Sequence, residues 1–200
     1  MGDSSGTGFS TANLQKGDTR YNVLNGVTYQ YIGGSAQESS NWRAVYGKTA
    51  YAQLSNILGS VPPTLDPYWV TFHQIDSIRN MSISQNGGTS IIIEEKGTYQ
   101  IVNGVQVSKT GGGGAATYLD HWIAKNEVTI PNTGVRIVIP TAAVTNVLTL
   151  NWIGELEVGD TIQKFLAVSD IGIGIGIYSI SPPVGPLIPA GLFTIVKLAT

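Results

Sequence analysis

The chain of 200 residues contains no cysteine, so its fold depends on no disulfide bond and on no thiolate-bound metal. Its two histidines are likewise too few for the usual zinc-binding sets. A chain of this length buries roughly 70% of its extended surface and needs no covalent or metal staple. We therefore expect one domain of ordinary size with a small appendage, and no cofactor or metal ion.

Charged residues are also scarce. Asp, Glu, Lys and Arg make up 12% of the chain, about half of the usual ~25%. Because 42% of the residues are hydrophobic, we expect other subunits to cover part of the surface. A β-rich monomer with a neutral polar surface is the alternative. A net charge of −2 and a pI near 5.6 provide no cationic surface for phosphates, which argues against nucleic-acid binding.

Long apolar runs are missing too. No run approaches the ~18 residues of a membrane span, so we expect no membrane insertion. The first residues, MGDSSGTGFSTANLQKGD, lack the basic and apolar regions of a signal peptide. Gly6 stands where an N-myristoylation motif needs a hydroxyl residue. If the protein works outside a cell, we expect it to be released by lysis rather than by ordinary secretion.

Strand and turn signals dominate what is present. Asn25-Gly26 and Asn103-Gly104 each separate two β-prone runs, as in tight type I′ hairpins, and residues 86–88 repeat the pattern. Short extended runs then recur at regular spacing to the end of the chain. Such spacing, with Gly, Pro and Asn between the runs, predicts an antiparallel β-sandwich or barrel.

One segment differs from this pattern. Residues 48–59, KTAYAQLSNILG, carry apolar side chains at helical spacing and predict one short helix. The chain is therefore expected to contain an N-terminal arm and β appendage (1–45), a connector with the helix (46–67) and the main sandwich (68–200).

The stretch DIGIGIGIYSI, residues 170–180, alternates isoleucine with glycine. On a strand, the isoleucines would share one face, in the core, and the glycines the other. Each glycine in a strand costs roughly 0.5–1 kcal/mol relative to alanine, so we expect close approach by another backbone or a bulky side chain. The approaching group is either a loop of the same chain or another subunit.

Three motifs resemble the tumour-necrosis-factor-like (TNF-like) jelly roll, the family that includes the globular heads of complement-type proteins. A G-x-Y strand is matched at 97–99, an L-x-x-G-D-x-I step at 156–162 and an F-T-I-x-K-L strand at 193–198. The resemblance covers roughly residues 68–200. It implies a jelly roll of two antiparallel sheets and a homotrimer with apolar and aromatic residues along its axis. The trimer-interface candidates are then Gly172, Gly174, Gly176 and Tyr178.

The N-terminal stretch that begins with GDTRYNVLNGVTYQYIGG and extends to SSNWR is similar to segments of bacteriophage tail fibres and other virion proteins. Together the two resemblances imply a virion surface protein, assembled in the host cytoplasm, whose N-terminal arm binds another capsid or fibre protein. We expect a homotrimeric fibre or spike head that attaches to a host receptor or glycan. A decoration (cement) protein that stabilises the capsid lattice is the alternative.

Aromatic side chains are the candidates for glycan contact, because the C–H faces of sugars stack on exposed rings. The candidates are Tyr29, Tyr31, Trp42, Tyr118 and Trp122. Asp120-His121 is the pair that most resembles part of a catalytic triad, but neighbours on a strand point to opposite faces and no G-x-S-x-G turn is present. We therefore expect no enzyme; a carbohydrate-active enzyme has the least support.

Overall fold

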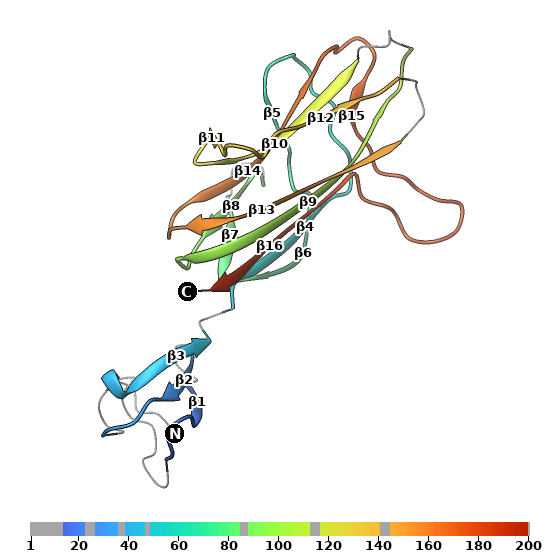
Figure 1. Cartoon of the computed structure of the whole chain (residues 1–200). Coiled ribbons are helices and arrows are strands. Elements are labelled where there is room, and N and C mark those ends of the chain that lie inside the picture. The colour runs from blue at the N-terminus through green and yellow to red at the C-terminus, as the bar shows by residue number, and fades with distance from the viewer. Residues whose placement is uncertain are drawn as a thin grey trace. The chain divides into compact units, whose positions relative to one another are not determined.

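The structure is a computed structural model that describes residues 14–22, 27–35, 39–46, 49–84, 88–112, 117–140 and 145–199. The regular structure in these ranges is β-strand, apart from the 3-10 turn η1 (Ser39–Asn41). The chain divides between Thr49 and Ala50 into a small N-terminal unit and a larger unit of residues 50–198 (Figure 1). Among the described residues, no helix is long and apolar enough to cross a membrane.

The small unit is a three-stranded antiparallel sheet. Its strands follow the order β1 (Thr19–Asn22), β2 (Val27–Tyr31) and β3 (Trp42–Tyr46). β1 and β2 pair as a hairpin would, but the predicted turn residues Asn25 and Gly26 lie outside the described residues, as does the arm before residue 14. The small core contains Tyr31 and Trp42, whose ring centroids are 5.3 Å apart.

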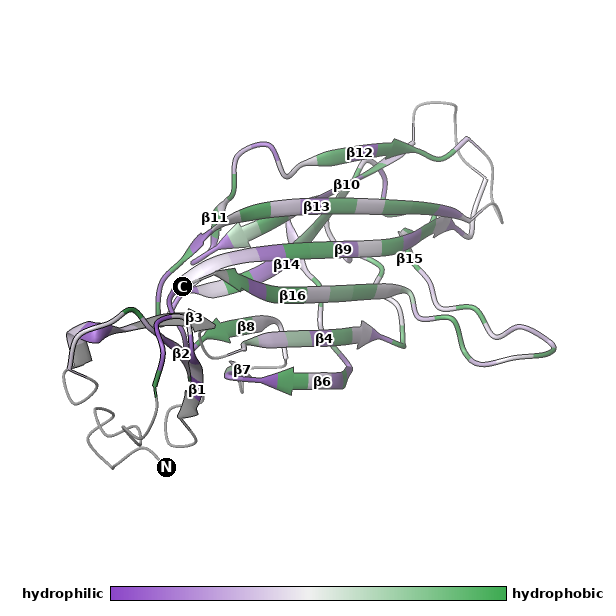
Figure 2. Cartoon of the chain, turned by 60° about the horizontal axis from the view of Figure 1, so that its bottom comes forward, coloured by the Kyte–Doolittle hydropathy of each residue, from purple (hydrophilic) through white to green (hydrophobic). Residues whose placement is uncertain are grey.

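Two antiparallel sheets build the larger unit (Figure 2). The seven-stranded sheet has the order β11-β10-β14-β8-β7, with β12 beside β10 and β5 beside β14. Its strands are β5 (Tyr68–Trp69), β7 (Met81–Ile83), β8 (Ser90–Ile93), β10 (Tyr118–Lys125), β11 (Val128–Thr129), β12 (Val135–Val138) and β14 (Thr161–Val168). The predicted antiparallel β-sandwich is confirmed.

The six-stranded sheet has the order β13-β9-β16-β4-β6, with β15 beside β9. Its strands are β4 (Tyr51–Asn56), β6 (Gln74–Arg79), β9 (Gly97–Lys109), β13 (Asn146–Leu156), β15 (Ile175–Ile177) and β16 (Gly191–Ala199). The longest pairing joins β9 and β13 in unbroken register, from Gly97 opposite Leu156 to Val107 opposite Asn146. Side chains along both strands alternate between the core and the outer face, which is the pattern that a one-sided sheet requires.

The predicted helix at 48–59 is wrong. Residues 51–56 form β4, which pairs with β16 on one side and with β6 on the other. Ala50, Ala52 and Leu54 are all buried. Their spacing of two residues fits a strand as well as the apolar pattern of residues 48–59 fits a helix. Pairing on both sides of the strand decides between the two, so residues 50–67 belong to the sandwich rather than to a connector.

The predicted hairpin turn at Asn103-Gly104 is also wrong. β9 runs straight through both residues, and Gly104 pairs with Thr149. The alternation of buried and outward side chains continues without a break across this point, and it outweighs the local turn preference. Of the third predicted turn, residues 86 and 87 lie outside the described residues.

The sandwich core consists of two apolar clusters that a polar layer separates. Ile101, Ile123 and Ile162 belong to one cluster. Val105, Leu119 and Leu166 belong to the other. On β9, β10 and β14, the inward position between these pairs is polar in each case, and the three residues are Asn103, His121 and Lys164.

Candidate functional site

The outer face of the seven-stranded sheet carries a row of three aromatic side chains. In the strand registers, Trp69 on β5 lies opposite Phe165 on β14, which lies opposite Trp122 on β10. Trp122 stacks on Phe165 with ring centroids 5.6 Å apart and an interplanar angle of 6°, and Trp69 meets Phe165 edge-on at 6.0 Å. Phe165 is only 8% exposed as a result, while Trp69 remains 48% exposed.

An ion pair lies next to this row. Asp120 on β10 lies opposite Arg136 on β12, and the Arg136 Nε and Nη2 groups donate to the two Asp120 carboxylate oxygens at 2.7 Å each. The Arg136 guanidinium also lies 3.6 Å from the centroid of the Tyr118 ring, in a cation–π arrangement. The hydrogen bond to Asp120 raises the pKa of Arg136 further, so this side chain keeps its charge.

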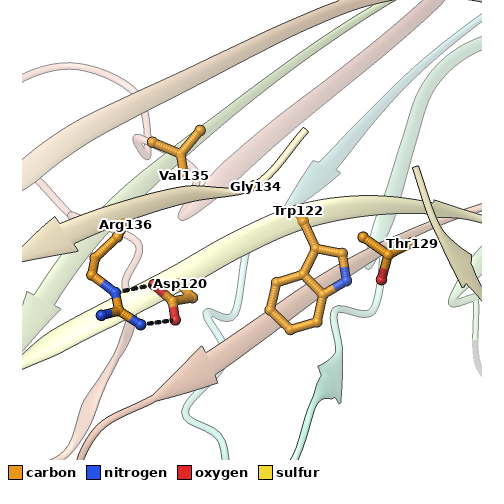
Figure 3. A pocket seen from close by; sticks show the side chains of 6 residues that line it. All are labelled: Asp120, Trp122, Thr129, Gly134, Val135 and Arg136. Carbon is orange, nitrogen blue, oxygen red and sulfur yellow. Dashed lines mark hydrogen bonds and ion pairs between the residues drawn. The ribbon is translucent and has the colours of Figure 1, made fainter. Parts of the chain in front are cut away.

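Trp122, Asp120 and Arg136 line an open hollow, which we call the Trp122 hollow (Figure 3). It measures about 390 Å³ and is lined by Asp120, Trp122, Thr129, Gly134, Val135 and Arg136. An indole wall beside a carboxylate and a guanidinium combines an apolar stacking surface with hydrogen-bonding groups of both kinds. A ligand with one apolar face and several hydroxyl groups matches this combination.

Two of the five predicted glycan-contact aromatics lie at this site, namely Tyr118 and Trp122. The prediction of Tyr31 and Trp42 as contact residues is not supported by their burial, because they are only 8% and 7% exposed and form the core of the small unit. Tyr29 is half-buried and packs against that same core. A small sheet has few other apolar groups to bury, which explains why its aromatic side chains turn inward.

Sequence reasoning missed three residues of this site: Trp69, Phe165 and Arg136. Each lies on a different strand from Trp122, and Trp69 and Phe165 also lie far from it in the sequence. Only the pairing of β5, β12 and β14 with their neighbours brings them together. The available sequence signal was the placement of Tyr118, Asp120 and Trp122 at every second position, which predicts one shared face.

The predicted continuous Ile–Gly strand is shorter than expected. Only Ile175–Ile177 form a strand, β15, and residues 171–174 form a turn in which Ile171 is half exposed. A Cβ added to Gly176 would lie 2.5 Å from the carbonyl oxygen of Ser60, and one added to Gly174 would lie close to the Thr110 hydroxyl. The close approach at Gly174 and Gly176 therefore comes from loops of the same chain.

The other interface candidates are also in contact with their own chain. The Tyr178 hydroxyl donates to the carbonyl oxygen of Gly174 at 2.6 Å. Gly172 lies at the exposed turn, where its amide donates to Asp170. Contacts within one chain do not decide whether a second subunit also touches these residues, so the place of Gly172, Gly174, Gly176 and Tyr178 in a trimer interface stays a prediction.

The polar layer in the core is sealed from solvent. His121 Nδ1–H donates to the carbonyl oxygen of Phe165 at 2.9 Å, and His121 Nε2 accepts from the Asn103 amide at 2.5 Å. Burial, with the neighbouring Lys164, lowers the pKa of His121 to about 3, so the imidazole is neutral. Asp120 and His121 do point to opposite faces, and a histidine that is fully buried cannot contact a substrate.

Lys164 completes the layer and is the least satisfied side chain in it. The residue is 1% exposed, and its Nζ has no hydrogen-bond partner among the described residues. Burial lowers the pKa of this amine to about 7. The amine reaches across the sandwich to β16, where a Cβ on Gly191 would lie 2.6 Å from Nζ, so glycine leaves the space that the lysine fills.

In the part of the chain that the structure describes, no group of three or more His, Cys, Asp and Glu side chains could hold a metal ion.

The fold and the exposed site define a jelly-roll β-sandwich with a ligand-sized hollow on one outer face. No protein-family model matches the chain, and no curated protein matches it in sequence. Crystal structures of murine APRIL at pH 8.0 and at pH 5.0 superpose on it with TM-scores of 0.50 and 0.49. In each case the sequence identity is 15%, and the match covers 76% of this chain and 100% of that chain.

APRIL is a jelly-roll domain of the TNF family. At 15% identity the likeness to the pH 8.0 structure shows the fold alone, and that fold is the TNF-like jelly roll which the three sequence motifs predicted. The resemblance of the N-terminal stretch to virion proteins finds no counterpart in these comparisons, so a virion origin stays a prediction.

Proposed function

We propose that the chain forms the homotrimeric head of a fibre or spike on a virus particle and that this head binds a glycan in the Trp122 hollow. The observation that carries the proposal is the hollow itself, in which an indole stands beside the Asp120–Arg136 ion pair on an open sheet face. Sugars are bound by stacking of their C–H face and by hydrogen bonds to their hydroxyl groups, and the hollow supplies partners for both.

The hollow is built in advance of binding. Trp122 is held by stacking on Phe165, and Arg136 is held by two hydrogen bonds to Asp120 and by the Tyr118 ring. Side chains that are already fixed lose little conformational entropy when a ligand arrives. Since Asp120 and Arg136 neutralise each other, the hollow favours a neutral sugar over one with a net charge.

The outer face of the six-stranded sheet supports the homotrimer. Six exposed apolar side chains point outward from β9, β13 and β16: Val102, Val147, Ile153, Leu192, Val196 and Leu198. Among the outward positions described on these three strands, Glu155 is the one charged residue. Several exposed apolar side chains on one face are typical of a protein contact, and the TNF-like resemblance implies a trimer.

Replacing Ile153 by aspartate is expected to dissociate the trimer, because the change places a charge within the proposed interface. Mass photometry of the wild type should give three times 21.2 kDa, and the variant should give 21.2 kDa. Val128→Asp is the control, since Val128 is 71% exposed on β11 of the other sheet. A monomeric wild type, or equal behaviour of both variants, would contradict the trimer or its placement.

Replacing Trp122 by alanine is expected to weaken glycan binding by at least ~10-fold, which corresponds to about 1.4 kcal/mol. The full-length protein would be screened on a glycan array, and the best ligand measured by calorimetry. Trp69→Ala is the matched control, because Trp69 belongs to the same aromatic row but does not line the hollow. Binding that survives Trp122→Ala unchanged, or an array without any ligand, would overturn the glycan proposal.

Cryo-electron microscopy of purified virions tests the position of the head. A trimer at a projecting tip agrees with an attachment role. A trimer that lies flat on the shell, with most of its lateral surface in lattice contacts, would replace this proposal by the cement role.

A further inference from the structure

A projecting loop, residues 178–190, joins β15 to β16; we call it the tongue (Figures 1 and 2). Its root is fixed by Gln106 of β9, which accepts from the Tyr178 amide at 3.0 Å and donates from its own amide to Ala190 at 2.8 Å. The Gln106 side chain adds a bond to the carbonyl oxygen of Pro189 at 2.7 Å. Further out, Ile180 and Ile188 exchange two backbone hydrogen bonds of 2.9 Å each. The tongue is thus an ordered two-armed projection.

The tip of the tongue is apolar and uncharged. Val184 is 90% exposed, and Leu187 and Ile188 are both more than two-fifths exposed. No charged residue occurs anywhere between Asp170 and Lys197. Four prolines stiffen the segment, at positions 182, 183, 186 and 189, so little entropy remains to be lost on docking. Such a projection gains free energy when an uncharged surface covers it.

A groove begins where the tongue is rooted. It measures about 320 Å³, lies on the outer face of the six-stranded sheet, and its walls include Gly104, Val147, Thr149, Pro189 and Leu192. None of the residues that line it is charged. The root of the tongue forms one wall, while the tip remains exposed and does not fill the groove of its own chain.

We propose that the tip of the tongue, Val184 and Leu187, packs into this groove on a neighbouring copy of the chain. The inference rests on the proposed homotrimer and specifies how its copies interlock. Both surfaces are apolar and uncharged, and the groove lies within the face already proposed as the interface through Val147 and Leu192. A projection and a recess at different places on one chain make a head-to-tail contact, which closes into a ring when repeated about an axis.

A lipid bilayer is the other apolar surface that a projecting loop could enter. Segments that insert at the membrane interface use Trp, Tyr, Lys or Arg to anchor themselves. Beyond Tyr178 at its root, which bonds to Gly174, the tongue has none of these residues. Its composition therefore favours a protein groove.

The absence of cysteine allows a clean cross-linking test in the full-length protein. The variant Val184→Cys/Thr149→Cys is expected, after mild oxidation, to run on a non-reducing gel as a covalent trimer. The control Val184→Cys/Val128→Cys, which places the second thiol on the other sheet, should remain uncross-linked. Val184→Asp should in addition raise the dissociation constant of the trimer at least ~10-fold, because it places a charge in the apolar groove.

The outcomes separate this inference from the proposed trimer. A wild type that is trimeric by mass photometry, with a Val184→Cys/Thr149→Cys variant that forms no interchain disulfide, overturns the tongue contact and leaves the trimer intact. A monomeric wild type overturns both. Binding of the wild type to neutral phosphatidylcholine vesicles that Val184→Asp abolishes would assign the tongue to membranes and would also overturn the inference.

Discussion

Replacing Lys164 by methionine is expected to stabilise the sandwich by roughly 3–5 kcal/mol at pH 6 to 7. The amine is fully buried and has no hydrogen-bond partner among the described residues. Burial lowers its pKa from 10.5 to about 7. A difference of one in pKa between the folded and the unfolded chain corresponds to about 1.4 kcal/mol. Methionine fills a similar unbranched volume beside His121 and Gly191 without an unpaired polar group.

The stability of the wild type should depend on pH in a way that the stability of Lys164→Met does not. Between pH 7 and 10.5 the unfolded chain holds the Lys164 proton while the folded chain has released it, so the wild type gains stability as the pH rises through this window. The methionine variant should lack that gain. Urea unfolding at several pH values between 6 and 10, at one protein concentration, measures both curves.

His121 titrates in a separate window. Its folded pKa of about 3 lies below the ordinary 6.5, so the unfolded chain binds the proton first as the pH falls. The wild type therefore loses stability as the pH falls from 6.5 to 3. The methionine variant should lose less in this window, because burial lowers the pKa of its His121 without the added effect of Lys164.

The matched control is the second buried lysine. Lys109 is also 1% exposed, but its amine donates to the Thr117 hydroxyl at 2.9 Å and to the carbonyl oxygen of Pro140 at 3.4 Å. Lys109→Met removes these bonds and is expected not to stabilise the protein. If Lys164→Met lowers the free energy of unfolding, or keeps the alkaline gain of the wild type, the amine has a partner that compensates its burial.

The second large effect is expected at the Ile–Gly stretch, where Gly176→Ala should destabilise the sandwich by about 1–3 kcal/mol or more. A methyl group there would lie 2.5 Å from the Ser60 carbonyl oxygen and 3.0 Å from the Val61 Cα, and both are backbone atoms that move only if the loop moves. Gly172→Ala is the control: its methyl group would approach only the Asp170 carboxylate, at 3.3 Å, and should change stability by less than ~0.5 kcal/mol.

The glycines of this stretch leave room either for a loop of the same chain or for another subunit. Thermal and urea unfolding, together with the mass of the protein in solution, distinguish the two. Packing against the chain's own loop predicts that Gly176→Ala lowers the unfolding free energy of the sandwich itself. A variant that loses the trimer while its subunits unfold as before would place another subunit on this face.

Much of the fold followed from local patterns. Alternation of apolar and polar residues in NVLTLNWIGEL identified one of the longest strands, because a sheet with one buried face requires a period of two. The same alternation runs through GTYQIVNGVQVSK, but the predicted turn at Asn103-Gly104 divided that strand into two. Scarce helix formers and frequent turn residues identified the class as all-β. Three short motifs identified the TNF-like jelly roll, which the superposition confirms.

Local patterns failed where two structures fit the same residues. The spacing of Ala50 and Leu54 fits a helix, whereas the spacing of Ala50, Ala52 and Leu54 fits a strand. The strand forms because β4 pairs with β16 on one side and with β6 on the other. Asn103-Gly104 has the composition of a turn, but its place in β9 was set by eleven consecutive pairs with β13.

The sequence alone thus determined that the fold is all-β and that charge is scarce, and its spacing places Tyr118 and Trp122 on one face of a strand. Tertiary structure alone decided that Trp69, Phe165 and Trp122 form one row, and that the buried Lys164 amine lies near His121 with no hydrogen-bond partner among the described residues. The reason is physical: the face on which a side chain lies depends on its own strand, whereas its neighbours depend on the register between strands that are distant in the chain.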